Sequence, residues 1–223
     1  MGLKVELREI ARPHMLRGQG ASEPIDLRFR TLIGREAWSR LPLAVQARFS
    51  KRIGAGRSAV YRGQVLSTRH SRVGWLLAQI LRSIGAPLPL ESGGEQAAMV
   101  NVSEHLPSGG QCWTRVYARR GGFPQTISSA KQFSGPTGLE EYLGRGIGMA
   151  LRVEADDHGL VFRSDHYFLR IGRLRLRIPH WMGPGRTTVT HRDLGAGRFA
   201  FDLRLDHPLF GPLVVQHAEF RDE

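Results

Sequence analysis

Residues 147–162, IGMALRVEADDHGLVF, decide the fold class of this chain. The first nine alternate apolar and polar side chains, which is typical of a strand with one buried face. Asp156, Asp157, His158 and Gly159 are turn-forming residues, and the apolar run resumes at Leu160. The stretch therefore predicts a β-hairpin.

The same period of two recurs through the second half of the chain, starting at Gln96. The intervening segments are too short for the crossover that a parallel pair requires, so neighbouring strands are predicted to be antiparallel. Residues 138–143 are predicted to form at most a helical turn. The predicted strands cover residues 57–66, 98–102, 112–116, 123–133, 147–155, 160–162, 174–178, 187–190, 199–205 and 213–220.

The clearest helix is predicted over residues 71–84. Ser71 is a natural N-cap, and Gly85 and Pro87 end the helix. Its outward face is predicted to carry Arg72, Trp75, Gln79 and Arg82. The apolar residues recur at helical spacing and are predicted to face inward: Val73, Leu76, Leu77, Ile80, Leu81 and Ile84.

Residues 1–25 show no sustained period and are predicted to be an N-terminal extension. Residues 26–223 are predicted to form a single, mainly antiparallel β domain that begins with short helices, the first of them capped by Asp26. A sheet this long must curl or split to protect its edges. We therefore predict an α+β, mainly β fold: a curved antiparallel sheet or half-barrel of about eight or nine strands, packed around the helix at residues 71–84.

The chain is strongly basic, with a formal charge of +12 and 32 basic against 20 acidic residues. Only three of the basic residues are lysines, and such an excess of arginine is typical of the coding bias of a GC-rich genome. This bias and an attraction for phosphates, nucleic acid or anionic lipid explain the positive charge equally well. No acidic residue lies between Glu36 and Glu91, which predicts a basic face. The acidic C-terminal end is expected to meet part of that face.

Several classes of protein are disfavoured. The longest apolar run, around Val73, is too short to span a membrane, and the first ten residues lack a signal sequence. The lone Cys112 excludes an internal disulfide and is predicted to be a buried, inert thiol. A cytoplasmic location is therefore expected.

No catalytic motif is present. The glycines at 144, 146 and 148 do not complete a dinucleotide fingerprint, and there is no P-loop or nucleophile elbow. Asp165 and His166 should lie on opposite sheet faces, so no acid–base pair is predicted between them, and Arg152 is predicted to pair with Glu154. The nine histidines lack compact metal-ligand spacing, although His166, His180, His191 and His217 could converge across a sheet. We predict no metal, no cofactor and no catalytic residue.

Two groups of residues are candidates for ligand binding. Arg173, Arg175 and Arg177 share one strand face and repel one another unless acids, solvent or an anionic ligand lie beside them. A face crossed by acids from a neighbouring strand is the favoured alternative. The aromatic candidates are Trp75, Trp113, Tyr117 and Trp181, for which a core position is the alternative. No nucleic-acid recognition motif accompanies these residues, so nucleic acid is not expected as a partner.

The chain resembles domain of unknown function 4166 over about residues 29–220. The resemblance is carried by LPLAVQARF at 41–49, WTR at 113–115, IPHW at 178–181, FAFD at 199–202 and HPLFGPLV at 207–214. Members of this family occur alone or C-terminal to a dehydrogenase-like Rossmann domain. The resemblance therefore implies a stand-alone member and transfers no catalytic residue.

Three functions follow as hypotheses. The first is a non-catalytic domain that binds a small hydrophobic or anionic amphipathic ligand in a cavity between sheet and helix, with arginines at its rim. The second is a lyase or isomerase that uses a titratable group in the same cavity. The third is an accessory domain that docks on a dehydrogenase-like partner and has a filled core and an exposed apolar patch.

Overall fold

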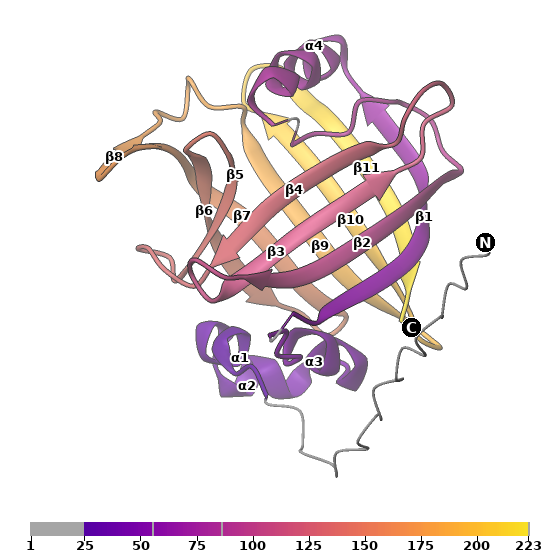
Figure 1. The fold of residues 1–223 in the computed structure, drawn as a ribbon, viewed down its shortest axis with the longest axis vertical. Helices are drawn as coiled ribbons and strands as arrows, with labels where there is room; N and C mark the ends of the chain where they lie inside the picture. The colour runs from indigo at the N-terminus through magenta and orange to yellow at the C-terminus, as the bar shows by residue number, and fades with distance from the viewer. Residues whose placement is uncertain (1–24, 55, 86, 223) are drawn as a thin grey trace, which may run out of the picture.

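The computed structural model describes residues 25–54, 56–85 and 87–222, so the predicted extension at residues 1–25 lies almost wholly outside the described part. Ten antiparallel strands form a closed ring in the order β6-β5-β4-β3-β2-β1-β11-β10-β9-β7, and β7 returns to β6 (Figure 1). The short strand β8 pairs with β7 outside the ring. The strands are β1 Ser58–His70, β2 Gln96–His105, β3 Gly110–Tyr117, β4 Gln125–Gln132, β5 Leu139–Gly144, β6 Ile147–Ala155, β7 Gly159–Ile171, β8 Leu174–Arg177, β9 Arg186–Gly195, β10 Arg198–His207 and β11 Gly211–Arg221.

The mainly β, antiparallel class and the hairpin at residues 147–162 are confirmed. The predicted curved sheet or half-barrel of eight or nine strands is partly right, but the barrel is closed and contains ten strands. One strand was missed at β5, where a helical turn was predicted. Its residues Leu139, Glu140 and Glu141 are all buried, so the strand shows no apolar–polar alternation.

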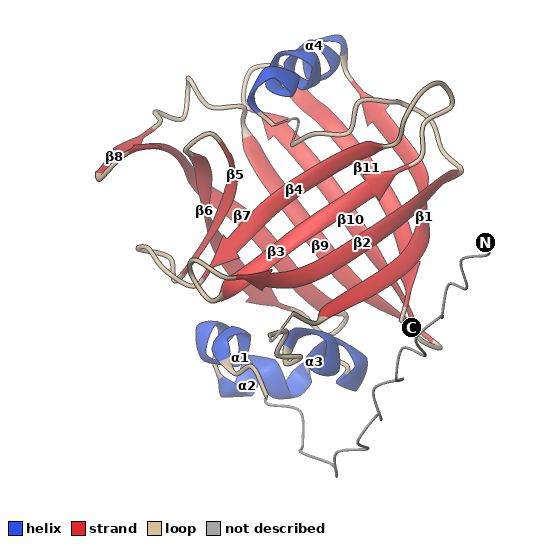
Figure 2. Ribbon diagram, in the orientation of Figure 1, coloured by secondary structure: helices blue, strands red, loops and turns tan. Residues whose placement is uncertain are grey.

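The predicted helix exists as α4 (Arg72–Leu81), followed by a 3₁₀ turn η1 (Arg82–Ile84), but the barrel does not enclose it. Figure 2 shows α4 at one end of the barrel. The Ser71 hydroxyl accepts a hydrogen bond from the Gly74 backbone N–H at 3.0 Å, which confirms the N-cap.

The predicted inward face of α4 is only partly right, because, of the α4 residues predicted to face inward, only Leu77 and Leu81 pack against the core. Gly74 and Ala78 are buried, whereas Val73, Leu76 and Ile80 are exposed. A Cβ added at Gly74 would lie 1.9 Å from the Leu213 carbonyl oxygen on β11. This close approach places the small residues Gly74 and Ala78 against the barrel, so Val73, Leu76 and Ile80 turn outward while Leu77 and Leu81 are half-buried.

Three short helices close the opposite end of the barrel: α1 (Arg28–Ile33), α2 (Arg35–Arg40) and α3 (Leu43–Phe49). The ring of Phe29 packs edge-on against Phe49 at 5.1 Å, and both are buried against Phe162 of β7. The predicted N-terminal helices are therefore confirmed.

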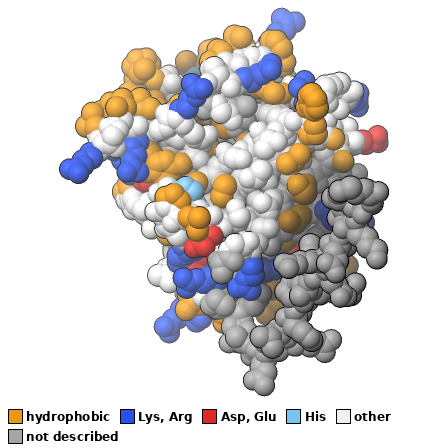
Figure 3. Space-filling model, viewed as in Figure 1, with side chains coloured by type: hydrophobic (Ala, Val, Ile, Leu, Met, Phe, Trp, Pro, Cys, Tyr) orange, Lys and Arg blue, Asp and Glu red, His pale blue; other side chains and the backbone are white. Residues whose placement is uncertain are grey.

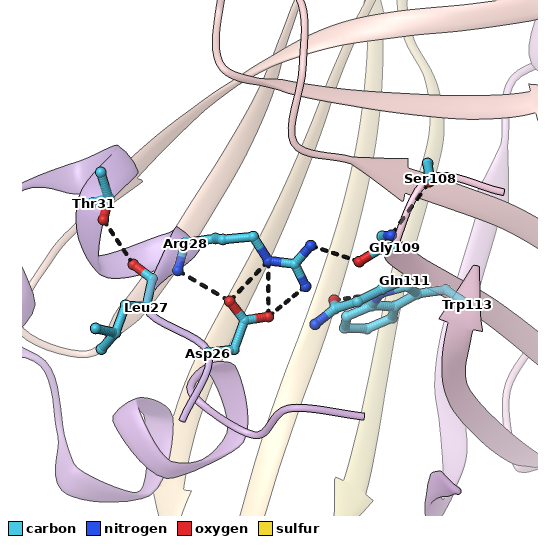
Figure 4. A network of polar contacts seen from close by, with 9 residues as sticks. Asp26, Leu27, Arg28, Thr31, Ser108, Gly109, Gln111 and Trp113 are labelled. Atoms are coloured by element: carbon cyan, nitrogen blue, oxygen red, sulfur yellow. Dashed lines mark hydrogen bonds and ion pairs between the residues drawn. The ribbon is translucent and has the colours of Figure 1, made fainter. Parts of the chain in front are cut away.

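Asp26 lies at the start of α1, as predicted, although Leu27 occupies the N-cap position. Its carboxylate accepts a hydrogen bond from the Arg28 backbone N–H at 3.0 Å and further bonds from the Arg28 guanidinium (Figure 4). The guanidinium also donates to the Gly109 carbonyl at 2.6 Å, which links α1 to the β2–β3 turn.

One arginine from the acid-free segment meets the C-terminal end of the chain. Arg48 on α3 is almost fully buried and forms ion pairs with Asp193 at 3.1 Å and with Asp222 at 2.7 Å. The expected contact between the basic segment and the acidic end is therefore present at this point.

Candidate functional site

The barrel encloses a cavity of about 70 Å³. A second cavity of about 60 Å³ lies on the α4 side and shares Arg115, Glu141 and Thr187 with the first. A third, of about 20 Å³, lies on the α3 side. Most of the lining of the main cavity is apolar: Val100, Trp113, Met149, Leu151, Phe162, Val189, Phe201, Leu203, Ala218 and Phe220.

Three ionisable side chains face this apolar cavity. Lys131 Nζ on β4 lies 3.1 Å from a Glu141 carboxylate oxygen on β5, and Arg115 on β3 lies 3.6 Å from the other oxygen. The Ser129 hydroxyl accepts a hydrogen bond from Arg115 at 2.7 Å and donates one to Glu141. The Lys131 ammonium also stands 4.6 Å from the centre of the Trp113 ring.

The cluster carries two positive charges and one negative charge. Among the described residues, the buried Nε of Arg115 has no hydrogen-bond partner. A buried donor of this kind is costly when unpaired, and it points to an acceptor that the chain itself does not provide. The cavity is therefore electropositive.

Burial and the neighbouring charges have opposite effects on the pKa values of Glu141 and Lys131. Burial favours a neutral Glu141, but the positive charges of Lys131 and Arg115 outweigh it and lower the pKa of that carboxyl. Burial lowers the pKa of Lys131, an effect that the adjacent Glu141 only partly offsets. Glu141 is thus held ionised, and the positive form of Lys131 depends on it.

His191 of β9 is the histidine inside the barrel, next to the third cavity. Its ring packs 5.0 Å from the rings of Phe49, Phe199 and Phe201, and neither ring nitrogen has a hydrogen-bond partner among the described residues. Burial, together with the positive charge of Arg48, lowers the pKa of His191 to about 3. The ring is consequently neutral near pH 7 and is a weak base.

The wall between β7 and β9 is incomplete toward the α4 end. β7 pairs with β9 only at residues 159–163, and beyond this the Ile178 backbone N–H, at the start of the β8–β9 loop, donates to the Tyr167 carbonyl at 2.8 Å. The Tyr167 hydroxyl and the Thr187 hydroxyl lie 2.6 Å apart in the wall. Thr187 lines the main and the second cavity, and Tyr167 both lines the second cavity and borders an outer groove of about 640 Å³.

Asp165 and His166 border the same outer groove, and the prediction that they cannot pair is wrong. His166 Nδ1 lies 2.8 Å from an Asp165 carboxylate oxygen. The register of β6 against β7 shifts at this point and leaves Asp165 without a strand partner, so a β-bulge breaks the alternation of faces. Hydrogen bonds from His166 and then Arg152 lower the pKa of Asp165.

The bulge also changes the ion pairs that were predicted. Arg152 contacts Asp165 at 2.7 Å, and Glu154 contacts Arg163 at 3.2 Å, so Arg152 and Glu154 do not form the predicted pair.

Of the seven predicted ligand-binding residues, Trp113 and Tyr117 line the main cavity. Trp75 on α4 and Trp181 in the β8–β9 loop are exposed and do not line it. Two of the arginines, Arg173 and Arg177, are also exposed on the β8 hairpin.

The third arginine of the predicted ladder, Arg175, contacts the buried Glu140 of β5 and stacks over Phe168 at 4.0 Å. This contact agrees with the alternative that acidic residues of another strand, and not a ligand, lie beside the arginines. The prediction that Arg173, Arg175 and Arg177 form the cavity rim is therefore not supported.

The charged residues of the cavity were not predicted. Trp113, Arg115 and Tyr117 point inward, and Cys112, which was predicted to be buried, is half-buried. The available signal was that Trp113, Arg115 and Tyr117 follow one another at intervals of two residues and so share one face of a strand. Lys131 lies in the strand predicted at residues 123–133, whose inward face was not assigned, and Glu141 lies in the segment that was predicted to form at most a helical turn.

The fold and the site define a class of protein: a closed ten-stranded antiparallel barrel with a small electropositive cavity. The family model of the domain of unknown function DUF4166 matches residues 41–220, and the chain belongs to this family. A comparison with curated proteins gives no match.

Two further findings concern the described residues. None of their helices has the length and apolar character needed to cross a membrane. Within the same residues, no group of three or more His, Cys, Asp and Glu side chains is placed to hold a metal ion.

Proposed function

We propose that the barrel binds a small anionic amphipathic ligand, with its negative group at Arg115 and Lys131 and its apolar part against Trp113 and Phe201. The observation that carries this proposal is the excess positive charge in an otherwise apolar cavity. The alternative ligand class, a purely hydrophobic molecule, leaves that charge without a role.

The electrostatic argument favours an anion. An uncompensated ion inside a protein is costly, by several kcal/mol even after relaxation. Glu141 neutralises one of the two cations, and a carboxylate ligand would neutralise the other. It would also supply an acceptor for the unpaired Arg115 Nε.

The cavity volume limits the size of the ligand. A water-sized group needs at least about 10–15 Å³ by this measure, so 70 Å³ holds about five such groups. A carboxylate with a short carbon chain fits this space. A longer chain would extend toward the second cavity, where Leu81 and Leu88 are part of the lining.

The first test is native mass spectrometry of the protein purified from its own host, compared with the denatured mass. We expect a reproducible additional mass of a small acid, because a ligand well above its dissociation constant stabilises the folded state and survives gentle purification. The second test is calorimetric titration with straight-chain carboxylates of two to eight carbons and with the matching alcohols.

The variant Arg115→Gln should weaken carboxylate binding about 10- to 100-fold, because a hydrogen bond to a charged group contributes about 1.5–3 kcal/mol. Arg163→Gln, at an exposed arginine on the outside of β7, is the matched control and should bind as the parent does. Equal binding by Arg115→Gln, or the absence of both an additional mass and carboxylate binding, would refute the proposal.

A lyase or isomerase in the same cavity is the second candidate. It is favoured by the titratable pair Lys131 and Glu141. Burial lowers the pKa of Lys131, so its ammonium group gives up a proton at a lower pH than an exposed lysine does. A retained ligand that is chemically changed on incubation, with loss of the change in Lys131→Met, would support the enzyme over the binding domain.

A further inference from the structure

The α4 end of the barrel exposes many large apolar side chains on separate elements. Trp75, Leu76 and Ile80 project from α4, Phe123 from the β3–β4 loop, Trp181 from the β8–β9 loop and Leu209 from the β10–β11 turn, and each is more than half exposed. Figure 3 shows hydrophobic and basic side chains next to one another over this end. An apolar surface of this extent is unusual unless it has a partner.

Arginines lie among these apolar residues. Arg72 and Arg82 flank the exposed face of α4, and Arg173 and Arg177 extend from the β8 hairpin. Arg82 donates to Gln79 and Arg177 contacts His180, and within the described residues none of the four arginines is paired with a carboxylate. The segments 66–90 and 166–186 of this end contain no Asp or Glu, and the acidic residues near them include Glu91, Glu95 and Asp206.

We propose that this end of the barrel is a bilayer face, which docks on a membrane surface rich in anionic lipids. We define the bilayer face by Arg72, Trp75, Leu76, Ile80, Arg82 and Trp181. Aliphatic and tryptophan side chains enter the boundary between headgroups and acyl chains, while arginines contact lipid phosphates.

The arrangement fits a bilayer better than a protein. The apolar side chains stand on a helix, two loops and a turn that are far apart in sequence, so they form separate projections instead of one groove. A soft lipid interface accepts separate projections, whereas a protein partner needs matching shape. Basic residues outnumber acidic ones at this end, where Glu91 is paired with Arg119 and Asp206 with Arg204, and this excess is complementary to an anionic surface. This proposal does not depend on a ligand in the barrel cavity.

The test is sedimentation of the full chain with vesicles of phosphatidylcholine alone or with one third phosphatidylglycerol. We expect binding to the anionic vesicles and much weaker binding to the neutral ones, with loss of binding at high salt. Arg72→Gln/Arg82→Gln should weaken binding about 25-fold, about fivefold for each arginine. Leu76→Ser/Ile80→Ser should weaken it at least about tenfold.

The matched control is Leu43→Ser/Leu106→Ser, at two equally exposed leucines on the opposite end of the barrel. The control should bind as the parent does, and all variants should keep the parent's thermal midpoint because the substituted side chains are exposed. Failure of the parent to bind anionic vesicles would overturn the proposal, as would equal weakening by the control. Self-association that is abolished by Leu76→Ser/Ile80→Ser, without vesicle binding, would assign the face to a protein contact instead.

Discussion

Replacing His191 by phenylalanine should remove a specific part of the acid sensitivity of the barrel. The ring of His191 lies among Phe49, Phe199 and Phe201 and makes no hydrogen bond within the described residues, so a phenyl ring suits the site chemically. We expect the free energy of unfolding at pH 7 to change by less than about 1.5 kcal/mol, as is usual for apolar replacements of similar volume.

The magnitude at lower pH follows from the pKa of His191, which is lowered from 6.5 in the unfolded chain to about 3 in the folded protein, mainly by burial. Between these values the unfolded state binds a proton that the folded state does not. The contribution of His191 to the free energy of unfolding is therefore fully present above the unfolded pKa and is lost as the pH falls toward 3. At pH 5, about 1.5 units below the unfolded value, the loss is about 2 kcal/mol at about 1.36 kcal/mol per unit.

Urea unfolding at pH 7 and pH 5 measures this difference. The parent should lose about 2 kcal/mol more stability between these values than His191→Phe does. His158→Asn is the control, because His158 lies exposed in the β6–β7 turn, and it should follow the parent. Parallel losses for the parent and His191→Phe would show that the buried imidazole does not determine the acid response.

The stabilities of four further variants can be measured by the same urea unfolding. Glu141→Gln should destabilise the protein by about 3–5 kcal/mol because it leaves two buried cations without their counter-charge. Lys131→Met should cost less, since Glu141 keeps its contacts with Arg115 and Ser129, and the reverse order would contradict the charge argument. Gly74→Ala should cost about 3 kcal/mol through its clash with Leu213. Ser71→Ala, which removes only the N-cap bond, should cost about 1 kcal/mol, so equal costs at residues 71 and 74 would exclude the close packing of α4.

At the outer groove, a β-bulge makes the prediction from strand alternation wrong. Asp165 and His166 are adjacent in a strand, and regular alternation places adjacent side chains on opposite faces. The β-bulge at Asp165 brings them within hydrogen-bonding distance instead. A single sequence contains no signal for an extra residue in one strand of a pair, because the bulge is a property of the register between two strands.

The sequence by itself determined the features that depend on neighbouring residues: the antiparallel strands, the β6–β7 hairpin, the Ser71 cap and the short N-terminal helices. These follow from local periods and from hydrogen bonds that span three or four residues. Tertiary structure alone decided that the barrel closes, because closure depends on the pairing of β1 with β11 across most of the chain. It also decided that Arg115, Lys131 and Glu141 point inward, since a buried ion is acceptable only where strands from different parts of the chain bring opposite charges together.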